Sequence, residues 1–267
     1  MIKSLFKTLA VALVGFSSLN GIYAQDVRDK VSYGDIKPKA PSSLRFMSYN
    51  IRIGIGMDNE VDIARVAEVI KRVNPDVVAL QEVDSVTERV NWANQIMQLS
   101  ELTGMYPIFG HAVDRSKGKY GIGMLTRTKP ESIRKVPLPG DEEPRLLIIS
   151  DFKDYVVCST HFSLVEKDRV TSAGILIKEL EGIKKPVLIG GDFNAKPGSK
   201  PVEIMKSKFD LLSSESFITY PSDTPRVCLD YVWGLKQKGY KYNVTQSVSI
   251  NEPMASDHLP LVTDIKL

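Results

Sequence analysis

The sequence predicts an α/β fold in which mixed β-sheets carry helices on their outer faces. Many short runs are rich in Val, Ile, Leu and aromatic residues, and only a few stretches show apolar residues at helical spacing. Residues 44–267 contain neither an internal repeat nor a linker, so we expect one domain there. With 43% hydrophobic and 25% charged residues, the composition excludes a disordered, collagen-like or coiled-coil chain.

The expected strands are short apolar runs with high β-propensity. Some follow each other in hairpin order and others are separated by helical patterns, which indicates sheets with both parallel and antiparallel pairs. We expect at least eight strands, over residues 46–51, 77–83, 120–126, 146–152, 155–162, 186–193, 229–234 and 259–265.

Three segments have helical character. In the first, Ile63, Val66 and Ile70 fall on one face and Pro75 ends the run. The second covers residues 170–180. We expect Ser163 and Glu166 to form a capping box that starts this helix just after His161. The third pattern is weaker and covers residues 91–102.

Residues 1–24 have the pattern of an export signal. Lys3 and Lys7 precede the apolar run 9–19, and the residues up to Ala24 lead into polar sequence. The alternative is a membrane anchor, but the run has about half of the ~20 residues that a membrane span needs. We therefore expect cleavage near Ala24, export to the periplasm or the medium, and no stable membrane insertion.

Residues 25–43 are polar and include Pro38 and Pro41, so we expect a linker there. The chain has 35 Lys and Arg against 32 Asp and Glu, and removal of Lys3 and Lys7 leaves 33 against 32, a net charge of +1. Proteins that bind nucleic acid through its phosphates need a larger positive excess. The charge therefore argues against a nucleic-acid packaging role, and we expect a monomer.

The two cysteines, Cys158 and Cys228, are too few for a disulfide scaffold. Each lies in an apolar run, so they could form one bridge or stay as two buried thiols. Neither has the Cys or His spacing of a zinc site.

Polar residues gather at the ends of the expected strands. Taken singly, an Asn or Asp at a strand end is more often a turn residue or a helix cap. Together, however, carboxylates, amides and imidazoles at buried strand ends indicate a shared site, because such groups lose free energy on leaving water unpaired. These residues are Asn50, Glu82, His161, Asp192, Asn194, Asp230, Asp257 and His258.

Three other patterns are weaker evidence for a functional site. The glycines of GIG at 54–56 lack the third glycine and the strand-turn-helix context of a dinucleotide loop. Ser159 and Ser256 lie near histidines without the GxSxG elbow of a serine hydrolase. His111 has no motif around it, and we expect it at the surface.

The ordered motifs YNIR, LQEV, STHFS, GGDFNAKPGS, LDYVW and SDHLPLV resemble the endonuclease/exonuclease/phosphatase superfamily. They occupy residues 49–52, 80–83, 159–163, 190–199, 229–233 and 256–262. The resemblance spans residues 44–267 and implies a four-layer sandwich, with two mixed sheets face to face and helices outside. It also implies a divalent-metal site at one end and hydrolysis of a phosphate ester.

Hydrolysis of a phosphate ester needs a cation, an aimed water and donors for developing charge. Glu82, Asn50 and Asp257 offer the hard oxygens that suit Mg²⁺, or Mn²⁺ or Ca²⁺ in its place. Asp192 and Asn194 share the GDFN turn and are expected to hold the attacking water.

His258 is the expected donor to a phosphate oxygen, with Asp230 orienting its ring. His161 is the second candidate donor, and the sequence does not assign tasks between the two histidines. Arg52, Tyr120 and Arg145 are candidates for contacts with the substrate phosphate. Each of them also fits a purely structural role.

The substrate class stays open, because surrounding loops select it. A nucleic acid fragment, a phospholipid headgroup and a sugar phosphate all fit an exported phosphodiesterase. The alternatives are a phosphomonoesterase or a true endonuclease on the same site, or a binding protein without turnover. The complete set of motif residues favours an enzyme.

Overall fold

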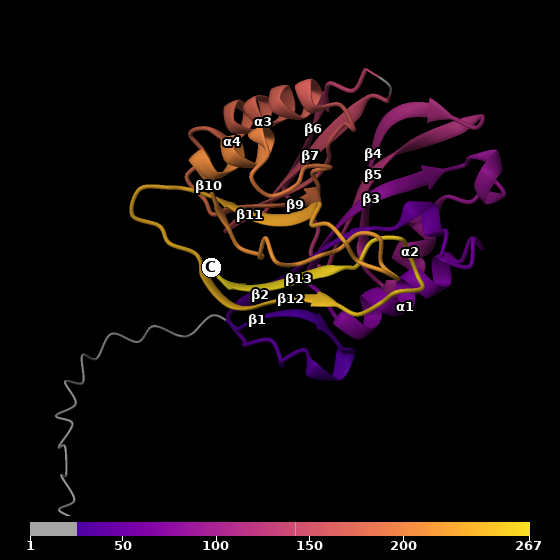
Figure 1. Ribbon diagram of the computed structural model, residues 1–267, viewed down its shortest axis with the longest axis horizontal. Helices are drawn as coiled ribbons and strands as arrows, with labels where there is room; N and C mark the ends of the chain where they lie inside the picture. The colour runs from indigo at the N-terminus through magenta and orange to yellow at the C-terminus, as the bar shows by residue number, and fades with distance from the viewer. Residues whose placement is uncertain (1–25, 142) are drawn as a thin grey trace, which may run out of the picture.

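A computed structural model describes residues 26–141 and 143–267. In this part of the chain, two β-sheets of seven and six strands pack face to face, and four α-helices cover their outer faces (Figure 1). The predicted four-layer α/β sandwich is therefore confirmed. The expected export signal at residues 1–24 lies outside the described residues.

The first sheet combines strands from both ends of the chain. Its strand order is β1, β12, β13, β2, β3, β5, β4. The β1/β12 and β2/β3 pairs are parallel and the others antiparallel. The strands are β1 (Asp26–Val31), β2 (Ser43–Asn50), β3 (Val77–Ser85), β4 (Tyr106–Arg115), β5 (Gly118–Thr126), β12 (Asn243–Ile250) and β13 (Leu261–Lys266).

The second sheet comes from the middle of the chain. Its strand order is β10, β11, β9, β8, β7, β6, and only the β8/β9 pair is parallel. The strands are β6 (Ser132–Leu138), β7 (Arg145–Asp151), β8 (Val156–His161), β9 (Val187–Asp192), β10 (Phe209–Leu211) and β11 (Asp230–Leu235).

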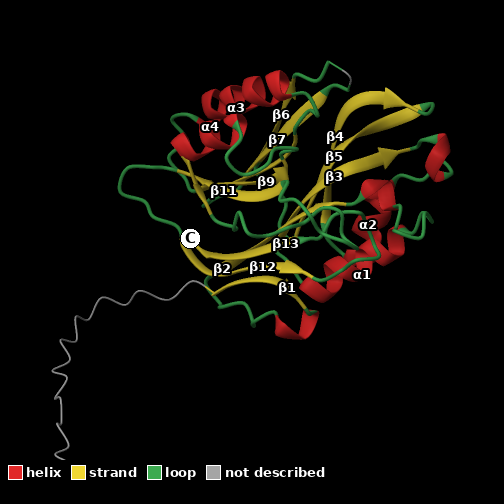
Figure 2. Cartoon of the chain, in the orientation of Figure 1, coloured by secondary structure: helices red, strands yellow, loops and turns green. Residues whose placement is uncertain are grey.

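The helices form two pairs, one on each outer face (Figure 2). Helices α1 (Ile63–Val73) and α2 (Gln95–Thr103) cover the first sheet, and α3 (Glu166–Leu180) and α4 (Lys200–Lys208) cover the second. Short 3₁₀ turns occupy Tyr33–Asp35, Arg52–Gly54 and Glu88–Val90. No helix among the described residues is both long and apolar enough to cross a bilayer.

Alternation along β2 shows how one strand serves two layers. Phe46 packs between the two sheets, whereas Met47 and Tyr49 belong to the core cluster beneath α1. Across the sheet interface, a side chain on Gly190 of β9 would put its first carbon 2.8 Å from the ring of Phe46. The glycine therefore allows the two sheets to approach closely at this point.

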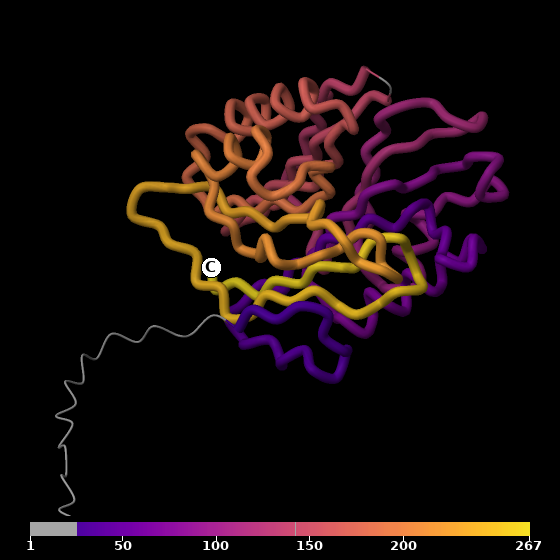
Figure 3. The backbone as a smooth tube through the Cα atoms, in the orientation of Figure 1, coloured from indigo at the N-terminus to yellow at the C-terminus, as the bar shows by residue number. Residues whose placement is uncertain are grey.

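The chain crosses from one sheet to the other and back. The last strand, β13, lies between β2 and β12, so early and late parts of the chain run side by side (Figure 3). As a result, the first sheet is complete only when β12 and β13 join it.

The eight predicted strands are confirmed, with ends that differ by up to three residues. The linker predicted for residues 25–43 is wrong, because residues 26–31 form β1 and pair with β12. Five of the thirteen strands among the described residues were not predicted: β1, β4, β6, β10 and β12. All of these except β12 lie at sheet edges, and the charged residues of β1 and β6 hide the apolar alternation.

The first predicted helix is confirmed: Asp62 caps its start, and left-handed Asn74 ends it before Pro75. The third starts at Gln95, four residues later than predicted. The capping box at the second helix is wrong. Ser163 Oγ instead accepts from the backbone N–H of Val165 at 3.0 Å, and it donates to Asp168 at 3.1 Å.

Cys158 and Cys228 are buried free thiols, so the bridge between them is absent. His111 lies at the surface as predicted, with Nε2 2.9 Å from Asp114 Oδ1.

Candidate active site

Polar side chains from both sheets meet at one end of the sandwich. In the second sheet, Asp192 pairs in register with His161 on its parallel neighbour and with Asp230 on its antiparallel one. Asn50 ends β2 in the first sheet, and the loop before β13 brings His258 to the same edge. These ends surround a cavity of about 510 Å³.

Nine of the eleven residues predicted for the site line this cavity, and two lie behind it. The lining residues are Arg52, Glu82, Tyr120, Arg145, His161, Asp192, Asn194, Asp257 and His258. The two behind the wall, Asn50 and Asp230, are buried and contact lining residues. Their positions fit residues that orient the groups in front of them.

A β-bulge directs Glu82 into the cavity. The pairing of β3 with β5 shifts between Leu80 and Val83, and Glu82 within this shift has a left-handed φ of 57°. A non-glycine residue in this conformation is strained, and such strain concentrates at functional sites. Glu82 Oε1 accepts a hydrogen bond from Asn50 Nδ2 at 3.0 Å.

Asp257 brings a second carboxylate to the same side of the cavity. Its Oδ2 lies 3.5 Å from Nε of Arg52. Burial raises the pKa of Asp257, and the nearby negative charge of Glu82 raises it further, against the opposing effect of His258. The two carboxylates thus destabilise each other's charge, which a bound cation would relieve.

The oxygens on this side fit a hard divalent cation. Two carboxylates reach the cavity, and the set has neither sulfur nor imidazole nitrogen, as Mg²⁺ prefers.

Hydrogen bonds on both sides of its amide fix the side chain of Asn50. Its Oδ1 accepts from the backbone N–H of Arg52 at 3.1 Å, and its Nδ2 donates to Glu82 and, at 3.1 Å, to Asp192. Asn50 therefore links the carboxylate of Glu82 to that of Asp192.

Asp192 accepts hydrogen bonds on both carboxylate oxygens. Oδ1 accepts from the backbone N–H of Asn194 at 2.8 Å, and Oδ2 accepts from Asn50. Nε2 of His161 and of His258 lie 3.4 and 3.7 Å from Oδ2. Burial alone would raise the pKa of Asp192, but the charge of His258 and the bond from His161 hold it well below its usual range. Asp192 is therefore an anion that accepts hydrogen bonds strongly and protons weakly.

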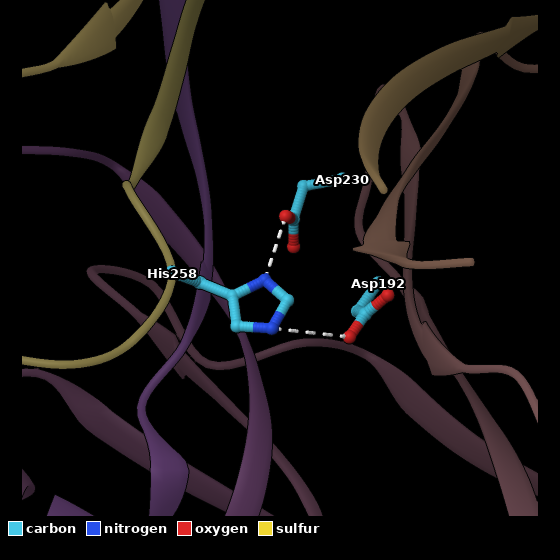
Figure 4. Close-up of side chains that lie close together, drawn as sticks. All are labelled: Asp192, Asp230 and His258. Carbon is cyan, nitrogen blue, oxygen red and sulfur yellow. Dashed lines mark hydrogen bonds and ion pairs between the residues drawn. The ribbon is translucent and has the colours of Figure 1, made fainter. Parts of the chain in front are cut away.

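His258 lies between two carboxylates (Figure 4). Its Nδ1 is 2.8 Å from Asp230 Oδ2, which also accepts from Thr219 Oγ1 at 2.5 Å. Burial alone would lower the pKa of His258, but Asp230 and Asp192 outweigh it and raise this pKa to about 10. The ring is therefore an imidazolium at neutral pH.

The ligand atoms of Asp192, Asp230 and His258 lie within 4.8 Å of one another, which is close enough to bind a metal. The protonation of His258 argues against that use. Nδ1 is engaged by Asp230, and a protonated Nε2 has no lone pair for a cation. This cluster serves better as a donor to an anion, with the cation on the Glu82 side.

His161 has a different set of neighbours from His258. Nη1 of Arg145 lies 3.0 Å from its Nδ1, and Nδ2 of Asn194 lies 3.1 Å from its Nε2. Because a guanidinium can only donate, Nδ1 of His161 must accept. Nε2 of His161 lies between the Asn194 amide, which is a donor, and Oδ2 of Asp192, which is an acceptor. Asn194 also donates from Nδ2 to the Phe162 carbonyl at 3.0 Å, which fixes the amide beside the ring.

Several lining residues were not predicted from the sequence. Apart from Leu229, which begins the LDYVW motif, they come from loops and strand ends without a recognisable motif, and only their positions in the folded chain reveal them. These residues are Ile53, Ile55, Arg89, Arg115, Glu143, Leu164, Tyr220 and Leu229.

Known proteins match the chain in sequence and in structure. Exodeoxyribonuclease III from Haemophilus influenzae is 25% identical over 178 residues, which are 60% of this chain and 61% of that protein, so the chain spans less than two thirds of this relative.

Two solved structures share the fold. An endonuclease/exonuclease/phosphatase from Bacteroides vulgatus is 20% identical, with a TM-score of 0.70 over 84% of this chain and 99% of that one. A mannosyl-6-phosphatase from Bacteroides thetaiotaomicron is 16% identical, with a TM-score of 0.67 over 84% of this chain and 100% of that one.

The family assignment depends on a match to the family as a whole. The model of the endonuclease/exonuclease/phosphatase family matches residues 47–258, which include every residue predicted for the site. Members of this family hydrolyse phosphate esters. This chain belongs to the endonuclease/exonuclease/phosphatase family.

Proposed function

We propose that this chain is an exported, divalent-metal-dependent phosphoesterase that hydrolyses phosphodiester bonds in small substrates by in-line attack of water. One observation carries the proposal. Asp192 is held as an ionised acceptor between the carboxylates of Glu82 and Asp257 on one side and the imidazolium of His258 on the other. A cation site, an acceptor for water and a donor to phosphate therefore adjoin one cavity.

Glu82 and Asp257 would hold Mg²⁺, or Mn²⁺ or Ca²⁺, with Asn50 orienting Glu82 or adding its amide oxygen. When bound, the cation neutralises charge on the phosphate and lowers the pKa of water. Asp192 orients the water through a hydrogen bond, since its low pKa makes it a poor proton acceptor.

In the proposed reaction, the water oxygen forms a bond to phosphorus as the bond from phosphorus to the leaving oxygen breaks. The water loses one proton and the leaving oxygen gains one. His258 donates from Nε2 to a phosphate oxygen, and Asp230 keeps the ring charged and oriented. His161 is the second donor, with Arg145 and Tyr120 in the same cavity for the other phosphate oxygens.

The substrate is a nucleic acid fragment, a phospholipid headgroup or a sugar phosphate. The net charge of +1 without Lys3 and Lys7 supports a small substrate, because long duplexes need many phosphate contacts. The likeness to exodeoxyribonuclease III supports diester chemistry. The fold shared with a mannosyl-6-phosphatase keeps a monoester as the alternative.

The test compares hydrolysis of bis(4-nitrophenyl) phosphate, a diester, with that of 4-nitrophenyl phosphate, a monoester. We expect Mg²⁺-dependent release of nitrophenolate, faster from the diester, and its loss in chelator with recovery on adding back the cation. Faster monoester hydrolysis would favour a phosphatase. Hydrolysis that chelator leaves unaffected would overturn the metal-dependent mechanism.

Export and a monomeric state are part of the proposal. They predict that the full chain, produced in a bacterium, is recovered outside the cytoplasm with a new amino terminus after Ala24. They also predict a mass near that of one chain by light scattering. An uncleaved chain that stays in the membrane fraction would instead indicate an anchor.

A further inference from the structure

Two arginines that were not predicted from the sequence flank Tyr120 at the cavity. The guanidinium carbons of Arg89 and Arg115 lie 5.1 and 5.4 Å from the centre of the Tyr120 ring. Arg89 comes from the turn after β3, Arg115 ends β4, and Tyr120 belongs to β5. All three line the same cavity as His161 and Asp192.

Three guanidinium groups share two carboxylates on this wall. Arg89 binds Asp84 through two bonds of 2.7 and 2.8 Å. Glu143 receives both Arg115, at 2.5 Å, and Arg145, at 2.9 Å. Among these five groups one positive charge is left over, and Glu82 is a further carboxylate in the same cavity. A charge beside a partly enclosed cavity favours an anion, because water there screens it less.

The wall also has unused donors. Nε of Arg145 is buried, as only 8% of this residue is exposed, and it has no hydrogen-bond partner among the described residues. The Tyr120 hydroxyl likewise has no hydrogen bond within the described chain. Burial raises the pKa of Tyr120, so its hydroxyl keeps its proton. A buried donor without a partner is costly, and a ligand oxygen would satisfy it.

The wall adjoins the proposed reaction centre. Arg145 contacts both Glu143, which binds Arg115, and His161, which faces Asp192. The arginine wall and the reaction centre are thus joined through one side chain, and both line one cavity of about 510 Å³. This volume accommodates a small molecule that reaches both.

We propose that Arg89, Arg115 and Tyr120 form a second anion subsite, which selects small phosphate esters that carry another phosphate group near the scissile one. The inference rests on the proposed function and adds the substrate class to it. Arg145 lies between the two subsites and serves both.

Arg115 is the residue to change. Arg89 neutralises buried Asp84, so its loss would leave an unpaired charge in the core and endanger folding. Arg115 is 41% exposed. Its partner Glu143 also forms an ion pair with Arg145, which remains when Arg115 is removed. Arg134 is the matched control, because it pairs with Glu179 at 2.8 Å and is 51% exposed.

The experiment uses two probes that differ by one phosphate: thymidine 5′-(4-nitrophenyl phosphate) with and without a 3′-phosphate. In the unmodified protein with Mg²⁺, we expect kcat/KM to be at least about tenfold higher with the 3′-phosphate, as one charge-assisted contact supplies. Arg115→Gln should bring this ratio close to one, Arg115→Lys should keep part of it, and Arg134→Gln should leave it unchanged.

A binding measurement in chelator separates the two proposals, since it needs no hydrolysis. Calorimetry compares thymidine 3′,5′-bisphosphate with thymidine 5′-monophosphate on the same variants. If both nitrophenyl probes are hydrolysed equally well and both nucleotides bind equally well, the subsite is overturned and the phosphoesterase stands.

If neither probe is hydrolysed but the bisphosphate binds more tightly in a way that needs Arg115, the phosphoesterase is overturned and the subsite stands. If Arg115→Gln and Arg134→Gln lose the preference for the 3′-phosphate equally, the preference comes from general surface charge and the subsite is overturned.

Discussion

His161 and His258 direct Nε2 toward the same atom, Oδ2 of Asp192, at 3.4 and 3.7 Å. Their other ring nitrogens have opposite partners. Nδ1 of His161 faces the guanidinium of Arg145, and Nδ1 of His258 faces the carboxylate of Asp230. The carboxylate holds the ring of His258 as a cation, which suits this ring to be the charged donor of the site.

The ion pair with Asp230 predicts how His258 titrates in the metal-free protein. The pKa of His258 is raised to about 10, so its ring signals should keep imidazolium shifts at pH 8. The measurement is proton–nitrogen NMR of labelled imidazoles in the presence of chelator, with His258→Gln to assign the signals. A His258 that loses its proton near pH 6.5 would contradict the ion pair with Asp230.

The same pair predicts how stability depends on pH. The pKa of His258 is higher in the folded than in the unfolded state, so the stabilisation is fully present below the unfolded value near 6.5. It is lost as pH rises through about 10. Urea unfolding between pH 6 and 10 should show this decline, and His258→Gln should flatten it. An equal decline in both proteins would assign it to other groups.

Asp192→Asn tests the water-orienting carboxylate. The change keeps the volume but replaces an acceptor with a donor that faces Nε2 of two histidines. We expect kcat to fall by about a thousandfold while KM changes little. Asp210→Asn, at a position 47% exposed on the surface, is the control and should retain activity. Unaltered turnover in Asp192→Asn would exclude the assigned role.

Glu82→Gln tests the cation site. Loss of one anionic oxygen should raise the Mg²⁺ concentration for half-maximal activity. We expect an increase of at least about tenfold, because even removal of a residue that only supports a metal ligand lowers metal affinity by that much. The affinity for Mn²⁺, measured by calorimetric titration in the absence of substrate, should fall in parallel. The control is Glu88→Gln, which removes a 53% exposed carboxylate. Unchanged metal dependence would place the cation elsewhere.

The buried cysteines predict slow thiol chemistry. Burial raises the pKa of Cys228 to about 12 and that of Cys158 still further. Because the thiolate is the reactive form, a disulfide reagent at pH 8 should detect no thiol in the native protein and both thiols in denaturant. Absence of thiols in denaturant without reductant would reveal a bridge.

Salt dependence tests the size of the substrate. A net charge of +1 without Lys3 and Lys7 predicts few contacts with phosphates beyond the site. For a duplex and a small diester at fixed free Mg²⁺, kcat/KM should fall with a slope equivalent to about one to three phosphates. A strong preference for the duplex with a slope equivalent to about six or more contacts would favour a true endonuclease.

The sequence predicted best the elements buried on both faces. Strands β2 and β9, which contain Phe46 and Leu188, are buried along their whole length because each packs on the other sheet and on helices. Edge strands such as residues 26–31 and 132–138 face solvent, so their charged residues resemble loops. Four of the five missed strands lie at such edges, and only β12 lies inside a sheet.

Some residues of the candidate site could be predicted from the sequence and others could not. Residues in motifs, such as Asp192 and Glu82, were found because chemistry fixes their type and order. Glu143 and Arg115 could not be found, because no motif surrounds them and their role depends on contacts between distant segments. The contact of His161 Nδ1 with Arg145 was also hidden, since Arg145 lies sixteen residues away on another strand.

The return of the chain to the first sheet has a consequence for protein synthesis. The loop that carries Asp257 and His258 and the strand β13 are made after the other described elements, yet β13 pairs with the early strand β2. A growing chain that still lacks these residues has neither the complete first sheet nor the complete cavity. We therefore expect chains truncated before Asp257 to be inactive.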